Sequence, residues 1–145
     1  MKKTILINCI ILLLISCSEK QKTKDELIKE SIASELKKAM KDSESYEFVS
    51  MEITETFNVK QRKEIINEEK LNEIKEMSKE IDVTDLLNHT EKELAFLNKQ
   101  TDNTKEAVYY VNFTAKGKNS FGATVKNDYS VTVLNDDIYT VLSLK

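Results

Sequence analysis

The hydrophobic positions of this chain change their spacing several times, and each change marks a predicted element. Thr23 and Glu26 have the spacing of a capping box, which predicts that a helix begins at about residue 24. The apolar residues that follow recur every three or four positions up to about residue 41, as on one face of a helix: Leu27, Ile28, Ile32, Leu36, Ala39 and Met40.

The middle of the chain predicts one strand followed by helical segments. Between Tyr46 and Val59 the pattern alternates, which places Val49, Met51, Ile53, Phe57 and Val59 on one side of a strand. Helical spacing returns over residues 60–81, with a stripe of Ile66, Leu71, Ile74, Met77 and Ile81. We expect a break near Asp82 and then a second helix that carries Leu86, Leu87, Leu94 and Leu97.

The last forty or so residues alternate strongly and predict a meander of three strands. The expected inward residues are Ala107, Tyr109, Val111, Phe113 and Ala115, and then Phe121, Ala123, Val125, Tyr129, Val131 and Val133. Residues 116–119 and 135–137 have the composition of turns, and residues 138–144 form the closing strand. The predicted fold class is α+β: an N-terminal helix, one strand, helical segments and a C-terminal antiparallel three-strand meander, with the helices on one face of the sheet.

The first sixteen residues differ from the rest and predict a secretory signal peptide. Lys2 and Lys3 form a basic start, and an apolar run of about a dozen residues follows up to Ile15. A run of this length is too short to cross a bilayer, which needs roughly 20 residues.

The segment Leu14-Ile15-Ser16-Cys17 resembles the bacterial lipobox: an aliphatic residue, a variable one, a small one and then cysteine. The resemblance implies a thioether-linked diacylglyceryl group on Cys17 and cleavage between Ser16 and Cys17. The new amino terminus is then open to acylation, for example with palmitate. The implied organisation is a signal peptide over 1–16, a lipidated tether over 17–23 and one α+β domain over 24–145.

Cysteine count and charge agree with a lipid anchor. Removing residues 1–16 takes away Cys9 and leaves Cys17 alone, so no intramolecular disulfide can form. It also leaves 20 basic and 25 acidic residues, a net charge of −5. We therefore expect the acyl chains, rather than the protein surface, to hold the protein on the membrane. By resemblance to enterobacterial sorting rules, Ser18 indicates the outer membrane of a Gram-negative bacterium, with the periplasmic and surface faces both open.

Few residues suggest chemistry. Arg62 is the only arginine beside 21 lysines, which argues against a nucleic-acid partner because bidentate phosphate and base recognition uses arginine. His89 is the only histidine and lies four residues from both Asp85 and Glu93. An acid-flanked histidine can act as a general base or a weak metal ligand. We prefer a solvated helix surface here, and we predict no catalytic residue, no metal site and no cofactor.

Three further features of the sequence predict local structure. The charged run from Lys60 to Lys70 is expected on an exposed helix face. Tyr109 and Tyr110 are adjacent in a strand and therefore point to opposite faces, so that one belongs to the core and the other to a surface patch able to bind a partner. Gly122 is expected to mark a bulge or bend that curves the sheet.

A second resemblance covers most of the predicted domain. The segments "SYEFVSMEIT" and "NSFGATVKNDYSVTV" resemble small uncharacterised lipoproteins of Bacteroidota, which share the order helix, strand, helices and meander. That group has no established activity to transfer. The plan of a helix against a bent sheet also resembles cystatin-like folds, which says nothing about function.

These observations predict a membrane-anchored cell-envelope lipoprotein with a small non-enzymatic domain that binds an envelope protein or a small ligand. One alternative is a cystatin-like small-ligand pocket protein or enzyme, with a cavity between sheet and helices. This alternative is excluded if Phe113, Phe121 and Leu94 fill the space between sheet and helices, because no cavity then remains. The other alternative is an inhibitor or immunity-type protein.

Overall fold

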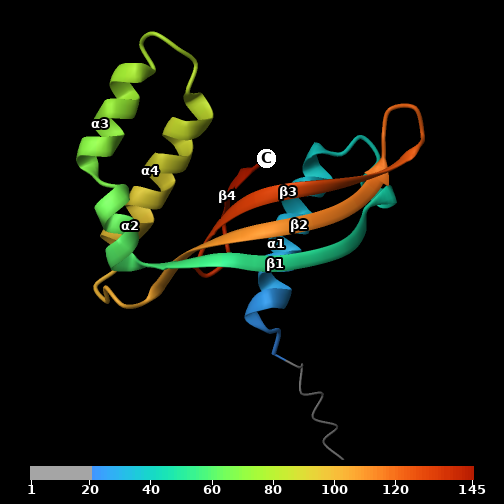
Figure 1. The fold of residues 1–145 in the computed structure, drawn as a ribbon, viewed down its shortest axis with the longest axis horizontal. Helices are drawn as coiled ribbons and strands as arrows, with labels where there is room; N and C mark the ends of the chain where they lie inside the picture. The colour runs from blue at the N-terminus through green and yellow to red at the C-terminus, as the bar shows by residue number, and fades with distance from the viewer. Residues whose placement is uncertain (1–20) are drawn as a thin grey trace, which may run out of the picture.

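The computed structural model describes residues 21–145, so the predicted signal peptide and the lipobox with Ser16 and Cys17 lie outside the described residues. Four helices and four strands follow one another in this part of the chain, with a short 3₁₀ turn at Ser43–Ser45 (Figure 1). In chain order they are α1 (Lys24–Ala39), β1 (Glu47–Asn58), α2 (Val59–Ile65), α3 (Glu68–Met77), α4 (Thr84–Asn98), β2 (Glu106–Lys118), β3 (Thr124–Leu134) and β4 (Val141–Leu144).

Helix α1 forms as the sequence predicts. The Thr23 hydroxyl accepts a hydrogen bond from the backbone N–H of Glu26, and the Glu26 carboxylate accepts one from the backbone N–H of Thr23. This capping box satisfies two N–H groups that the first turn leaves without helical partners. Ile28, Ile32 and Leu36 are spaced by four residues and are all buried on one face.

The sheet is antiparallel and its strands follow sequence order, β1-β2-β3-β4. The predicted C-terminal meander is therefore present as β2, β3 and β4. The sheet has four strands rather than three, because β1 pairs along β2 from Glu47 opposite Lys116 to Asn58 opposite Glu106. β2 and β3 pair from Val108 opposite Leu134 to Lys118 opposite Thr124 without a register shift.

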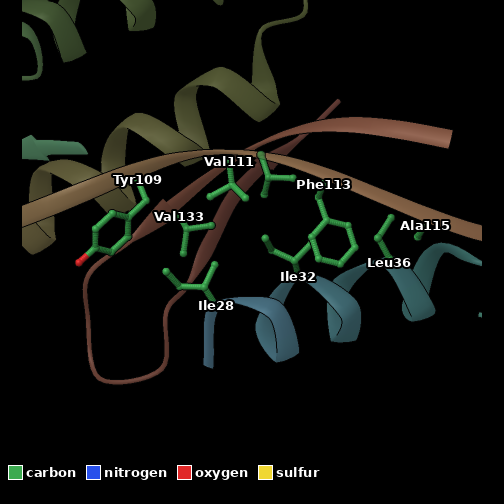
Figure 2. Close-up of a cluster of buried hydrophobic side chains, with 9 residues drawn as sticks. Ile28, Ile32, Leu36, Tyr109, Val111, Phe113, Ala115 and Val133 are labelled. Carbon is green, nitrogen blue, oxygen red and sulfur yellow. The ribbon is translucent and has the colours of Figure 1, made fainter. Parts of the chain in front are cut away.

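Helices cover both faces of this sheet, so the prediction of helices on one face is wrong. Tyr109, Val111 and Phe113 point toward α1 and form a first core with Ile28 and Ile32 (Figure 2). The residues between them point the other way. At the start of β2, a second core lies under α2 and α4, formed by Val59, Leu97, Ala107, Val108, Leu134 and Leu142. In Figure 1, α1 passes behind the sheet while α2, α3 and α4 stand together at one end of it.

Strand β1 contributes to both cores because its register shifts. Shifts occur between Phe48 and Ser50, between Ile53 and Glu55, and again before Asn58. The first two shifts leave Val49 and Thr54 as extra residues of β1, and each reverses the direction of the side chains that follow; at the third shift the extra residue is Ala107 of β2. Ile53 therefore packs against the first core and Phe57 against the second, although simple alternation predicts one side for both.

The predicted helix over residues 60–81 is two helices. α2 begins at a capping box of Asn58 and Gln61, and its C-cap Ile66 has an extended backbone. Asn67 then caps α3 by accepting a hydrogen bond from the backbone N–H of Lys70. The predicted break near Asp82 is confirmed, since α4 begins at Thr84.

The connection between β2 and β3 departs from the predicted strand pattern. Phe121, expected in the core, is 94% exposed at the hairpin turn. The Asn119 side-chain oxygen accepts hydrogen bonds from the backbone N–H groups of Phe121 and Ala123. Gly122 has φ +80°, the left-handed region that favours glycine, so it forms this turn rather than a bend within the sheet.

A buried ion pair joins α2 to α4. The Arg62 Nε and Nη2 groups donate hydrogen bonds of 2.6 and 2.9 Å to the two carboxylate oxygens of Glu93. Their side chains are only 7% and 5% exposed, so Arg62 does not belong to an exposed helix face as the charge pattern predicts. The Arg62 Nη1 group donates to the Tyr110 hydroxyl at 3.1 Å. Burial lowers the pKa of Arg62, but the hydrogen bonds and charge of Glu93 outweigh it, so the pKa is raised and Arg62 stays charged.

Removing one member of this pair should destabilise the protein more than removing both. We expect Arg62→Met to lower the free energy of unfolding by about 3–5 kcal/mol, because it leaves the Glu93 carboxylate buried without a counter-charge. The double variant Arg62→Met/Glu93→Leu should lose clearly less, because no buried charge remains. Urea unfolding followed by circular dichroism measures both losses. A double variant as unstable as Arg62→Met alone would contradict this account.

Candidate functional site

The half of the sheet face that α2, α3 and α4 leave uncovered forms a groove, which we call the sheet groove. Its floor is a hollow of about 450 Å³ on β1, β2 and β3, and its wall is a hollow of about 420 Å³ along the start of α4. Lys145 lines both hollows and joins them. The polar residues of the floor include Ser50, Glu52, Asn112, Thr114, Asp128 and Ser130. The wall residues are Asp82, Asp85, Leu86 and His89.

The alternation of β2 explains why this groove is polar. Successive residues of a strand point to opposite faces, so Asn112 and Thr114 lie on the face opposite Val111 and Phe113. Further back on that same face, Val108 and Tyr110 are apolar or aromatic because the helices cover them. The side chains become polar where the helical cover ends.

The groove is acidic. Four carboxylates line it, from Glu52, Asp82, Asp85 and Asp128, against the single ammonium group of Lys145. Asp128 accepts a hydrogen bond of 2.6 Å from the Thr114 hydroxyl. The backbone N–H of Thr84 donates to Asp82, and this bonding lowers the pKa of that carboxyl. A surface with this excess of carboxylates favours cationic or strongly polar ligands.

His89 lies half-buried in the wall of the groove rather than on a fully solvated helix surface. Burial lowers its pKa, and the positive charges of Lys92 and Lys145 lower it further against the opposing effect of Asp85. Glu93, its other predicted neighbour, is buried and bonded to Arg62. The structure therefore does not bring Asp85, His89 and Glu93 together as a general-base site.

The two adjacent tyrosines point to opposite faces, as predicted, but neither forms an open patch. Tyr109 is fully buried under α1, and its hydroxyl donates to the Glu106 carboxylate at 2.8 Å. Tyr110 packs against the second core, with its ring 5.0 Å from that of Phe57. The predicted surface patch is thus covered by the helices.

The sequence pattern does not single out the groove residues, although it contains one signal for them. Asn112 and Thr114 alternate with buried Val111 and Phe113, which indicates a solvated strand face. No sequence pattern brings Lys145, at the end of the chain, next to His89.

Three further searches of the chain return negative findings. Among residues 21–145 there is no group of three or more His, Cys, Asp or Glu side chains able to hold a metal ion. Within the same range, no helix is long and apolar enough to cross a membrane. Comparisons with protein-family models, with curated proteins and with solved structures find no match to this chain.

The environment of His89 can be measured directly, because it is the only histidine. We expect NMR titration of its ring protons to give a midpoint below 6.5, its ordinary value. Lys92→Gln should raise that midpoint, since it removes a positive charge that disfavours the imidazolium. Because the folded protein holds the neutral ring, stability should fall as the pH drops through this range, and His89→Gln should remove that part of the loss. A midpoint above 6.5 would contradict the half-buried placement of His89 near Lys92 and Lys145.

Proposed function

We propose that this protein is a cell-envelope lipoprotein, held on the membrane by lipid on Cys17, whose domain binds a partner through the sheet groove. The lipobox residues Leu14-Ile15-Ser16-Cys17 support the anchor. Acyl chains hold a protein on a bilayer because each buried methylene contributes about 0.8 kcal/mol, and two or more chains make the attachment stable. Residues 17–23 then form a tether that can span at most roughly 25 Å.

The placement of α1 supports this arrangement. α1 begins directly after the tether and packs on the sheet face opposite the groove. A domain tethered through α1 can therefore present the groove away from the attachment point. The resemblance of Ser18 to enterobacterial sorting rules extends the proposal to the outer membrane of a Gram-negative bacterium, on its periplasmic or its surface side.

The observation that carries the binding function is the uncovered, acidic half of the sheet face. The helices bury the apolar half of that face, whereas Glu52, Asn112, Thr114 and Asp128 remain open to solvent. We propose a non-enzymatic role for it, with an extended cationic segment of an envelope protein as the ligand. The carboxylates lie on different elements around the open face, Glu52 on β1, Asp128 on β3 and Asp85 on α4, so a segment with several basic side chains can pair with more than one of them.

The alternative of a ligand cavity between α1 and the sheet has less support. Ile28, Ile32, Leu36 and Phe113 fill the space between them (Figure 2). Of the three residues expected to close such a cavity, only Phe113 lies there; Phe121 is at the β2–β3 turn and Leu94 is buried in α4. No observation on the described residues favours an inhibitor or immunity role over this binding role.

The anchor is tested by Cys17→Ala in the full chain expressed in a Gram-negative host. The native chain should incorporate labelled palmitate and stay with the membrane fraction in high salt. The variant should incorporate no label and should keep residues 1–16, because lipid attachment to the cysteine precedes cleavage. Labelling and membrane fractionation with intact mass measure these outcomes. A processed, salt-resistant and membrane-bound Cys17→Ala protein would exclude the proposed anchor.

The groove is tested with two matched peptides, one alternating alanine with lysine and the other alternating alanine with glutamate. In NMR titrations of the full chain in detergent micelles, the lysine peptide should shift the amide signals of Asn112, Thr114 and Ser130. The glutamate peptide should leave them unchanged. The variant Glu52→Gln/Asp85→Asn should weaken binding of the lysine peptide by about tenfold, as two ligand charges lose their partners. Equal responses to both peptides, or shifts confined to other surfaces, would contradict the proposal.

A further inference from the structure

The outer edge of β3 is unpaired over the first half of the strand. β4 covers β3 only from Ser130 onward, where the N–H and C=O of Ser130 bond to those of Lys145 at 2.9 and 3.1 Å. From Thr124 to Tyr129, β3 pairs with β2 on its inner side, and no other strand of residues 21–145 pairs with its outer side. In Figure 1 this stretch forms the outer strand of the hairpin that projects beyond β4.

The direction of the free backbone groups follows from Ser130. In an antiparallel strand the N–H and C=O of one residue point to the same side, and the side alternates from residue to residue. Since Ser130 points outward to β4, Thr124, Lys126 and Asp128 also point outward. Their backbone groups are available to a further strand.

The two exposed edges of the sheet are not equivalent. β1, at the opposite edge, has three register shifts and carries Glu47, Glu52 and Glu55, all of which oppose pairing with another strand. The free half of β3 has no register shift. Its only charges are Lys126 and Asp128, which are of opposite sign.

We propose that the free edge of β3 pairs antiparallel with the same edge of a second copy of this chain, with Asn127 of one copy opposite Asn127 of the other. Outward-pointing residues must oppose one another in such a ladder. In this register Lys126 of each copy lies opposite Asp128 of the other. The neighbouring registers place Lys126 opposite Lys126, or Asp128 opposite Asp128, so charge selects the central one.

The side chains on both faces fit this register. On the groove face, Lys126 has no carboxylate within 4 Å among residues 21–145, and Asp128 is bonded only to Thr114. On the α1 face, half-buried Val125 of one copy lies opposite half-buried Tyr129 of the other. Both line a cavity of about 390 Å³ beside Met40 and Tyr46, and the buried Tyr46 hydroxyl has no hydrogen-bond partner among the described residues.

The symmetry leaves the rest of the molecule accessible. A two-fold axis between the two Asn127 residues and perpendicular to the sheet keeps both α1 helices on one face. Both sheet grooves then lie on the other face. Lys145, which already pairs with Ser130, limits the ladder to residues 125–129. The pairing does not depend on what the groove binds.

Cysteine cross-linking in intact cells tests this pairing in the full chain. Asn127→Cys should form a disulfide-linked dimer under mild oxidation, because directly opposed residues in a non-hydrogen-bonded pair have Cβ atoms about 4.5–5.5 Å apart. Glu55→Cys, an exposed position on the β1 edge, is the matched control and should remain monomeric. The measurement is the fraction of chain that runs at twice its mass on non-reducing gels.

Charge variants in the Asn127→Cys background test the register. Lys126→Asp should lower the dimer yield about tenfold, because two like-charged pairs replace two opposite ones. Adding Asp128→Lys should restore the yield, since the opposite charges are exchanged between the copies. Circular dichroism of each variant confirms folding. A yield no higher than that of Glu55→Cys, or one unaffected by Lys126→Asp, would overturn the proposal.

Discussion

The paired hydrogen bonds between Arg62 and Glu93 are the interaction on which the arrangement of the helices depends. Three helices, α2, α3 and α4, lie between β1 and β2 in the chain. The pair connects the first of these helices to the last. Its third contact, from Arg62 to the Tyr110 hydroxyl, ties this connection to the sheet. A buried charge pair fixes the relative position of the two helices that carry it, because moving either helix would leave a buried charge without its partner. It thereby holds the helices over one end of the sheet.

The position of the helices determines which part of the sheet can bind. β2 has three environments along its length: buried on the α1 face, buried under the helices near Val108, and open at Asn112 and Thr114. The open part is neither apolar nor neutral, since Glu52 and Asp128 lie beside it. The sheet groove is therefore the space that the helices leave, bordered by α4 with His89.

Attachment, binding and self-association involve different elements of the domain in our proposals, although Asp128 belongs both to the groove and to the free edge of β3. The tether would lead into α1 on one face, the groove lies on the other, and the free stretch of β3 lies at the edge between them. Each proposal rests on a separate observation: the lipobox, the acidic open face, and an unpaired edge whose charges complement those of its own copy. Failure of one would leave the other two standing.

The sequence by itself determined the elements whose causes are local. The capping box at Thr23, the four-residue spacing of Ile28, Ile32 and Leu36, and the alternation of β2 predict α1 and the meander, because their hydrogen bonds and periods involve neighbouring residues. Only the tertiary structure decided the rest. The bulges of β1 reverse the direction of its side chains. Arg62 bonds to Glu93, which is thirty-one residues away in the sequence. Lys145 lies in the wall of the sheet groove together with His89. These outcomes depend on contacts between distant segments, which no local pattern of charge or hydrophobicity encodes.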